Sequence, residues 1–323
     1  MNIGITGAGG QLGTALVRHT LARIPASGIV AITRDPGKLD QFAQQGVQVR
    51  PADFSQPSTL SSAFRGIEKL LIIPTSDLQP GVRRRQHVAA IESAVKSGVR
   101  HLIYISTVGA RPDPNNELID SHFATDQALI GSGVAWTILR MSVYTETLLD
   151  AAKRAVESGK YSAVPGAPAA YVVREDIAAA AAGILATSGH EGMTYHATGP
   201  VSVTQPQIAA AIAKAAGKQI DFVEMTAAQQ RAGLEAAGLP APLVNIFAGF
   251  QAALRAGIFD LVTGDIARLA DKPAESPAEF LARNLGSQAS GAGLHFKSSS
   301  PIRFSGNNRA KWAMIRRSRR RLR

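Results

Sequence analysis

Short apolar runs alternate with segments of helical periodicity along the first 140 residues of the chain. The apolar runs cover residues 2–6, 28–33, 47–50, 69–73, 101–106 and 135–140. Between them apolar residues recur at helical spacing, as Leu12, Leu16 and Leu21 do. Strands that alternate with helices form βαβ units, and their right-handed crossovers build a parallel sheet. The sequence therefore predicts an α/β fold with an open, doubly wound parallel sheet.

The periodicity loosens after residue 140, and the composition changes again at residue 287. We expect helices over 144–158, 174–187, 227–237, 242–256 and 277–285, a further helix capped by Thr204, a strand over 220–224 and a loop over 159–170. This pattern predicts three parts. Residues 1–155 form the sheet domain, residues 156–286 a smaller, mainly helical lobe interleaved with it, and residues 287–323 a basic, disordered tail.

The net charge of +11 is a property of this tail. Residues 287–323 contain ten Lys or Arg and no Asp or Glu, which leaves 25 basic and 24 acidic residues in the body. We therefore expect no nucleic-acid partner for the body, and the tail either binds polyanions without specificity or is a solvated extension.

The chain shows no sign of membrane insertion or secretion. No apolar stretch approaches the roughly 20 residues of a membrane span, and the amino terminus lacks the features of a signal peptide. The chain has no cysteine, which fits a reducing compartment. We expect a cytoplasmic protein with no membrane partner.

A glycine-rich segment joins the first expected strand to the first expected helix. Glycines at 7, 10 and 13 give the pattern G-x-x-G-x-x-G. Here Gly7 permits a tight turn, Gly10 lets the backbone approach a diphosphate, and Gly13 lets the helix pack close to the sheet, as in Rossmann-type dinucleotide-binding folds. We expect the loop and the first amides of the helix to bind the diphosphate, through Gly7, Gly9, Gly10, Gln11, Leu12 and Gly13. The same glycines also suit a simple tight turn.

The residues after the second strand distinguish the two common pyridine dinucleotides. NAD sites usually carry an acidic residue there, which binds the ribose 2′-hydroxyl. This chain has Arg34, 21 residues after Gly13, and a guanidinium can form two hydrogen bonds with a 2′-phosphate. We therefore predict NADP(H) in preference to NAD(H). Asp35 can accept from the ribose or cap the following helix, and Arg34 is also consistent with a solvated surface charge.

The ends of the later strands should complete the cleft, because parallel strands end at one edge of a sheet. We expect Asp53 near the adenine or as a turn cap, Pro74, Thr75 and Ser76 along the ribose, and Ser106 and Thr107 near the nicotinamide. Arg140 and Met141 follow the sixth strand, and Arg174 opens a later helix that we expect Asp176 to cap. These residues, apart from Asp176, are our further candidate cofactor contacts.

Several segments together resemble the NmrA-like atypical short-chain dehydrogenase/reductases. They are ITGAGGQLG, VAITRDP, VQVRPADF and EKLLII, followed by HLIYIS, HFATDQ, WTILRMSVY and GHEGMTY, within residues 1–285. In this family the sequence is most similar to the type-2 NAD(P)H:quinone oxidoreductases and the triphenylmethane reductases. The resemblance implies an NADPH-dependent reductase of quinones or similar flat acceptors. The chain departs from the family at Met141, where Asn is frequent, and at Gln127, where some members have Lys.

The tyrosines do not support the chemistry of ordinary short-chain dehydrogenases. Those enzymes use Tyr-x-x-x-Lys, in which the lysine lowers the tyrosine pKa, but no tyrosine here has lysine four residues later. Reduction of a quinone-like acceptor needs only direct hydride transfer from NADPH in a dry site. His122 and Tyr144 are our candidates for lining the acceptor pocket. His122 also fits an ordinary half-buried histidine, and Tyr144 also fits core packing or stacking on a flat ligand.

Two functions from different classes fit these observations. One is an NADPH-dependent oxidoreductase with a small-molecule acceptor, and the other is a redox sensor that binds NADP(H) and a partner protein without turnover. We expect no metal site, since the H-E-x-x-H spacing fails at His190, and no G-x-S-x-G hydrolase elbow occurs. We expect a monomer or a homodimer.

Overall fold

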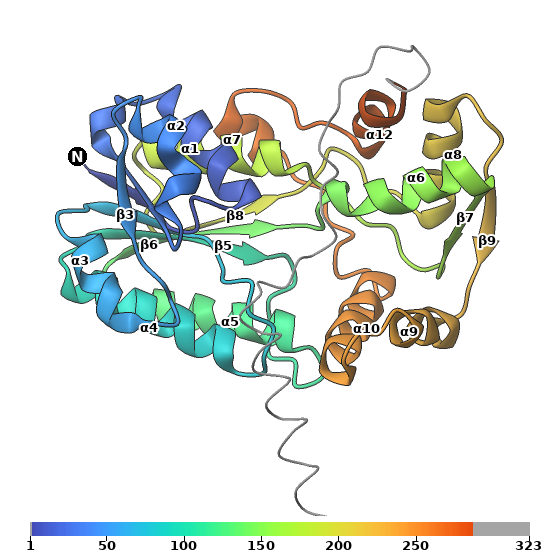
Figure 1. Ribbon diagram of the computed structural model, residues 1–323, viewed down its shortest axis with the longest axis horizontal. Coiled ribbons are helices and arrows are strands. Elements are labelled where there is room, and N and C mark those ends of the chain that lie inside the picture. The colour runs from blue at the N-terminus through green and yellow to red at the C-terminus, as the bar shows by residue number, and fades with distance from the viewer. Residues whose placement is uncertain (1, 287–323) are drawn as a thin grey trace, which may run out of the picture. The chain divides into compact units, whose positions relative to one another are not determined.

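A seven-stranded parallel sheet forms the centre of the fold (Figure 1). Its strands lie in the order β3-β2-β1-β4-β5-β6-β8, and every neighbouring pair is parallel. They are β1 (Ile3–Ile5), β2 (Ile29–Thr33), β3 (Gln48–Pro51), β4 (Lys69–Ile72), β5 (His101–Thr107), β6 (Ala135–Met141) and β8 (Met193–Ala197). The computed structural model describes residues 2–286, and our expectations for 287–323 lie outside these residues. The predicted doubly wound α/β fold is confirmed.

Helices cover both faces of the sheet, which explains why β1, β2, β4 and β5 are buried along their whole length. One face carries α1 (Gln11–Leu21), α2 (Asp40–Ala43), α7 (Arg174–Ala186) and α11 (Asp265–Ala270) (Figure 1). The other face carries α3 (Leu60–Phe64), α4 (Val82–Lys96) and α5 (Glu117–Ile130). The strand order reverses between β1 and β4, and ligands of such folds bind at the carboxyl edge beside this reversal.

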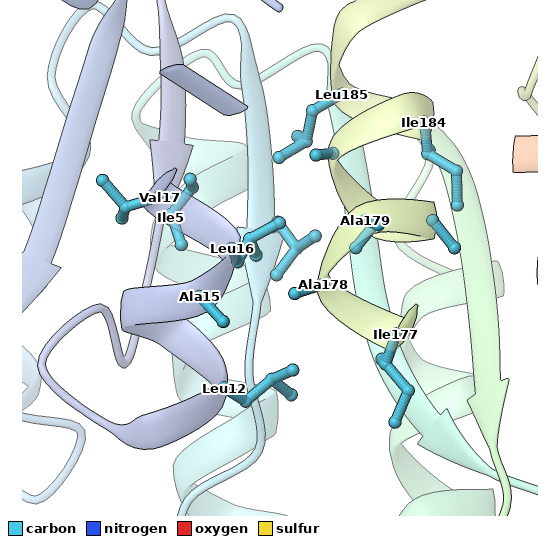
Figure 2. Close-up of a cluster of buried hydrophobic side chains, with 14 of the residues drawn as sticks. Ile5, Leu12, Ala15, Leu16, Val17, Ile177, Ala178, Ala179, Ile184 and Leu185 are labelled. Atoms are coloured by element: carbon cyan, nitrogen blue, oxygen red, sulfur yellow. The ribbon is translucent and has the colours of Figure 1, made fainter. Parts of the chain in front are cut away.

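The alanine-rich helix α7 packs directly on α1 (Figure 2). Leu12 and Leu16 of α1 face Ala178 of α7, whose small side chain permits the close approach. A Cβ at Gly183 would lie 1.9 Å from the Leu269 carbonyl oxygen, so α11 also approaches α7 closely. Figure 2 shows that α1 and α7 run in the same direction, so both begin at the carboxyl edge of the sheet.

A second group of elements follows the sixth strand and has its own apolar cluster, which includes Ile212, Phe259 and Leu281. It comprises α6 (Leu149–Ser158), β7 (Lys160–Ala163), α8 (Gln205–Ala216), β9 (Asp221–Glu224), α9 (Ala227–Ala236), α10 (Ala241–Arg255) and α12 (Pro277–Leu285). β7 and β9 pair in parallel as a separate two-stranded sheet. Thr204 caps α8 as predicted, because its side chain accepts from the Gln207 amide in a capping box.

Three elements differ from the sequence-based expectations. The expected loop over 159–170 contains β7, a polar strand without an apolar run to reveal it. The seventh strand of the main sheet, β8, was not predicted, because it is an edge strand that leaves Met193 41% exposed. α11 was also not predicted, since its six residues are too few to establish a helical period.

Candidate functional site

The glycine loop has the geometry of a diphosphate cradle. Gly7 adopts a φ of 64°, which only glycine enters without strain. A Cβ at Gly13 would lie 2.1 Å from the Gly7 carbonyl oxygen, and one at Gly9 would lie 2.7 Å from Thr33 Oγ1. The helix therefore touches the loop backbone to backbone at Gly13, and a side chain at Gly9 would collide with Thr33 at the end of β2.

The amino terminus of α1 offers free backbone donors. Gly10 occupies the N-cap without a side chain to satisfy the first amides, and the first turn carries no acidic residue. The amides of Gln11, Leu12 and Gly13 have no partner within the helix. Unsatisfied amides combine with the positive end of the helix dipole to attract an anion. A dinucleotide diphosphate fits this arrangement.

Two cations lie beside the loop, directly after β2. Arg34 is exposed and forms no hydrogen bond or ion pair with residues 2–286. Lys38 Nζ lies 3.7 Å from Asp35 Oδ2, and its Cβ lies 3.7 Å from the position of a Cβ on Gly9. Asp35 occupies an N-cap position but makes no capping hydrogen bond with its side chain. The Arg34 guanidinium is thus available to a ligand phosphate.

The ends of β3 to β6 lie along the same edge, as predicted for parallel strands. Asp53 Oδ1 accepts from the Ser55 amide at 2.9 Å, so this residue stabilises a turn, and its adenine contact remains a prediction. Ser106 and Thr107 pair in register with Arg140 and Met141. The two strand ends thus place all four predicted contacts side by side.

An ion pair fixes Arg140 at the end of β6. Its Nη2 donates to Asp126 Oδ2 at 2.9 Å, and the Asp126 side chain is fully buried. Burial raises the pKa of Asp126, while Ser106 and Arg140 oppose that shift by favouring the ionised form. The Arg140 side chain keeps 25% of its surface exposed. It is therefore held in one orientation but still reaches the surface of the site.

A buried polar network lies behind the loop that follows β4. The Thr75 amide donates to His87 Nε2 at 3.0 Å, and the Thr75 carbonyl accepts from Arg83. His87 therefore carries its proton on Nδ1, which lies 3.0 Å from Thr125 Oγ1. The network fixes both backbone groups of Thr75, a predicted cofactor contact.

His122 belongs to the same network. Arg83 Nη2 lies 3.1 Å from His122 Nε2, and a guanidinium only donates, so this nitrogen accepts. The other ring nitrogen, Nδ1, then donates to the Tyr104 hydroxyl at 2.8 Å. His122 is 2% exposed, and both of its nitrogens are engaged. It reaches the site only through Arg83.

The two buried histidines make stability depend on pH. Burial, reinforced by the Arg83 charge, lowers the pKa of His87 to about 3 and that of His122 well below its usual value. In the unfolded chain histidine titrates near 6.5. Below that pH the unfolded state binds protons that the folded state rejects, so stability is complete above about pH 6.5 and falls as pH drops toward the folded pKa. We expect His87 alone to lower the free energy of unfolding by about 2 kcal/mol between pH 7 and pH 5.

Urea unfolding at pH 5 and pH 7 tests this expectation. His87→Gln keeps an acceptor for the Thr75 amide but does not titrate, so its stability should fall less on acidification than that of the original chain. Identical pH dependence of the two proteins would contradict the assignment of His87 as a neutral buried base.

Tyr144 lies after β6 and packs against the Arg174 guanidinium, which the Glu146 carboxylate holds in place. The Arg174 guanidinium carbon is 4.6 Å from the centre of the Tyr144 ring, a cation–π contact. Glu146 Oε1 accepts from the Arg174 amide at 2.9 Å and lies 3.9 Å from its Nη1. Burial raises the pKa of Tyr144 to about 12, although Arg174 opposes the shift. The phenol therefore stays protonated and able to donate at neutral pH.

One sequence-based expectation near Arg174 was wrong. Asp176 does not cap α7 but accepts from Lys272 Nζ at 2.7 Å and from the Glu275 amide at 2.8 Å. It is buried within the first turn and holds the segment before α12 against α7. No local pattern could indicate this contact, since its partners lie about a hundred residues further along the chain.

Four polar residues of this region were missed by the sequence analysis. They are Lys38, Arg83, His87 and Tyr104. Arg83 and His87 are four residues apart on α4, and a buried pair at this spacing was hidden by the exposed arginines that follow Arg83. Tyr104 was considered only as a strand residue that lacks the lysine of Tyr-x-x-x-Lys.

Comparison with known proteins identifies the family. Residues 7–188 match the sequence profile of a family described as NAD(P)H-binding. The chain is 38% identical to quinone oxidoreductase 2 of Escherichia coli (strain K12) over 260 residues, which are 80% of this chain and 90% of that protein. It is 28% identical to the NAD(P)H azoreductase of Xenophilus azovorans over 282 residues, covering 85% of this chain and 95% of the other.

Solved structures give the same relationship. The NADPH complex of the E. coli quinone oxidoreductase has a TM-score of 0.81 and 35% identity, covering 87% of this chain and 99% of the other. The NADP(H) complex of Citrobacter sp. triphenylmethane reductase has a TM-score of 0.81 and 29% identity, covering 88% of this chain and 100% of the reductase. The chain therefore belongs to the NAD(P)H-binding, NmrA-like atypical short-chain dehydrogenase/reductase family, and it is an NAD(P)H-binding relative of these oxidoreductases.

The helices provide one further observation. Between residues 2 and 286, none is both long enough and apolar enough to cross a membrane.

Proposed function

We propose that this protein is a cytoplasmic, NADPH-dependent oxidoreductase that transfers hydride directly to a quinone-like or similarly flat, electron-poor small molecule. The observation that carries the proposal is the glycine cradle at the start of α1, in which Gly13 touches the Gly7 carbonyl and leaves no room for a side chain. Bound NADPH would supply the hydride. The residues of the chain bind and orient the cofactor and the acceptor, and they exclude water from the site.

The preference for NADPH over NADH rests on the residues after β2. Arg34 is exposed and has no partner among residues 2–286, and Lys38 lies next to Gly9. A 2′-phosphate carries negative charge and three acceptor oxygens, which suit a guanidinium. Asp35 is turned toward Lys38, which reduces its repulsion of a phosphate.

The other roles follow the order of the strand ends. In this proposal Asp53 lies toward the adenine, Pro74, Thr75 and Ser76 along the ribose, and Ser106, Thr107, Arg140, Met141 and Arg174 toward the nicotinamide. Tyr144 lines the acceptor side. Residues 1–155 contribute most of the cofactor contacts together with Tyr144, and residues 156–286 contribute Arg174 and the rest of the acceptor side.

Three observations support the choice of acceptor. No tyrosine carries the lysine of the usual alcohol chemistry, so an acceptor that takes hydride without a matched acid suits the site better. The relatives named for quinone and azo reduction act on flat, conjugated, electron-poor molecules. Arg174 stacked on Tyr144 presents a planar surface of suitable shape.

Steady-state oxidation of NADPH with a panel of quinones tests the proposal. We expect acceptor-dependent loss of the NADPH absorbance at 1 to 10³ turnovers per second, the common range for enzymes. NADH at the same concentration should support less turnover. Tight binding of NADPH with no oxidation by any quinone or azo compound would instead favour the redox-sensor function.

A further inference from the structure

Arg83 is a buried cation with no carboxylate of residues 2–286 in direct contact, although the charges of Asp77 and Glu117 lie near enough to favour its charged form. It lies in the first turn of α4, and the residue is only 5% exposed. Its three hydrogen-bond partners are neutral: the Thr75 carbonyl, Ser121 Oγ at 3.3 Å and His122 Nε2 at 3.1 Å. Among residues 2–286 no carboxylate forms an ion pair with it. Burying a charge that has no ion-pair partner is costly, so the folded chain maintains an unfavourable feature here.

The guanidinium is positioned at the carboxyl edge of the sheet. Thr75 follows β4, and Tyr144 follows β6, with β5 between these two strands. Arg83 donates a hydrogen bond to the Thr75 carbonyl. It is also close enough to the Tyr144 phenol for each group to shift the pKa of the other. Three of its five N–H groups serve Thr75, Ser121 and His122, and two remain without a partner among residues 2–286.

The rest of the network holds this cation rather than neutralising it. His122 accepts a hydrogen bond from Arg83 and donates one to the Tyr104 hydroxyl. That hydroxyl also lies 3.3 Å from His87 Nδ1. Both histidines remain neutral at physiological pH, so no proton of the network moves to relieve the charge. A fixed, desolvated positive charge stabilises an anion far more than the same charge does in water.

We propose that Arg83 stabilises the negative charge that the acceptor gains when it takes up hydride, and that His87, Tyr104 and His122 position its guanidinium for this purpose. The inference rests on the proposed function. Hydride carries two electrons and one proton, so its transfer from NADPH to a neutral quinone yields NADP⁺ and the hydroquinone monoanion. A proton from water then completes the hydroquinone. Arg83 acts on the first step, in which the negative charge develops on the acceptor.

Arg83→Met removes the charge and keeps a long apolar stem, while Arg83→Lys keeps a cation. Arg84→Met is the matched control, because Arg84 is the exposed neighbour on the same helix. The assay measures kcat for quinones that differ only in electron-withdrawing substituents, and the dissociation constant of NADPH is measured separately by calorimetry. We expect Arg83→Met to lower kcat by about 100-fold, the usual effect of removing one transition-state donor.

The dependence on the acceptor distinguishes charge stabilisation from structural support. Without Arg83 the anion must be stabilised by its own substituents, so kcat should rise more steeply with electron affinity in Arg83→Met than in the original chain. Arg83→Lys should keep the original dependence of kcat on electron affinity, with a smaller loss of kcat than Arg83→Met. If Arg83→Met does not fold, Arg83→Lys alone is compared with the original chain. Arg84→Met should match the original chain, and in the Arg83 variants the loss of NADPH affinity should be much smaller than the loss of kcat.

Equal losses for every quinone, accompanied by a parallel loss of NADPH affinity, would show that Arg83 only supports the Thr75 loop and would overturn this inference. A steeper slope in Arg83→Lys than in the original chain would overturn it as well. If the original chain binds NADPH but oxidises it with no acceptor, the proposed function fails first, and that result is seen before any variant is compared.

Discussion

Replacing Gly13 by alanine is expected to weaken NADPH binding by about 100-fold or more. The added Cβ would lie 2.1 Å from the Gly7 carbonyl oxygen and 2.7 Å from the Ala8 Cα, so helix α1 must move away from the loop. A displacement of about 1 Å at a binding group is enough for a loss of this size. Titration calorimetry of the folded variant with NADPH measures the effect, and its melting temperature shows whether the fold survives.

Gly233→Ala is the matched control for this substitution. Gly233 lies within α9, and a Cβ there would meet nothing within 4 Å. Its NADPH affinity should equal that of the original chain, with a slight gain in stability from the better helix former. If Gly13→Ala bound NADPH as tightly as Gly233→Ala does, the close contact of helix and loop would have no part in cofactor binding.

Arg34→Ala is expected to weaken NADPH binding by about 100-fold while leaving NADH binding nearly unchanged. Hydrogen bonds to charged groups contribute about 1.5–3 kcal/mol each, and a guanidinium can form two with one phosphate. NADH lacks the 2′-phosphate and therefore loses nothing of this kind. Dissociation constants for both dinucleotides, measured at one salt concentration, test the difference.

Arg154→Ala provides the comparison for a surface arginine remote from the loop, since Arg154 is exposed on α6. It should bind both dinucleotides normally. Equal losses for NADPH and NADH in Arg34→Ala would remove the 2′-phosphate assignment. They would leave Lys38 as the cation next to the glycine loop on which such a preference could rest.

The sheet could be predicted from sequence because its strands are buried on both faces. Runs such as residues 101–106 are apolar or small over most of their length, and the chain between them has a helical period. β8 joins only one neighbour and exposes Met193, so its residues alternate irregularly and resemble a loop. β7 is polar and pairs with β9, about sixty residues further along the chain, which no local pattern could indicate.

The site likewise has a part that could be predicted from sequence and a part that could not. The glycine loop is a local structure, and the spacing of Gly7, Gly10 and Gly13 already specifies a strand, a turn and a helix. The buried network is not local, since its members lie after β4, on α4, on β5 and on α5. His122 was singled out from the sequence as an acceptor-pocket residue. The arginine that separates it from the site became visible only in the folded chain.

A crystal structure of the protein grown with NADPH tests the central claim most directly. We expect the diphosphate within hydrogen-bond distance of the Gln11 and Leu12 amides, with the 2′-phosphate on Arg34. An absence of bound dinucleotide at saturating NADPH, or a diphosphate held away from the start of α1, would contradict the account.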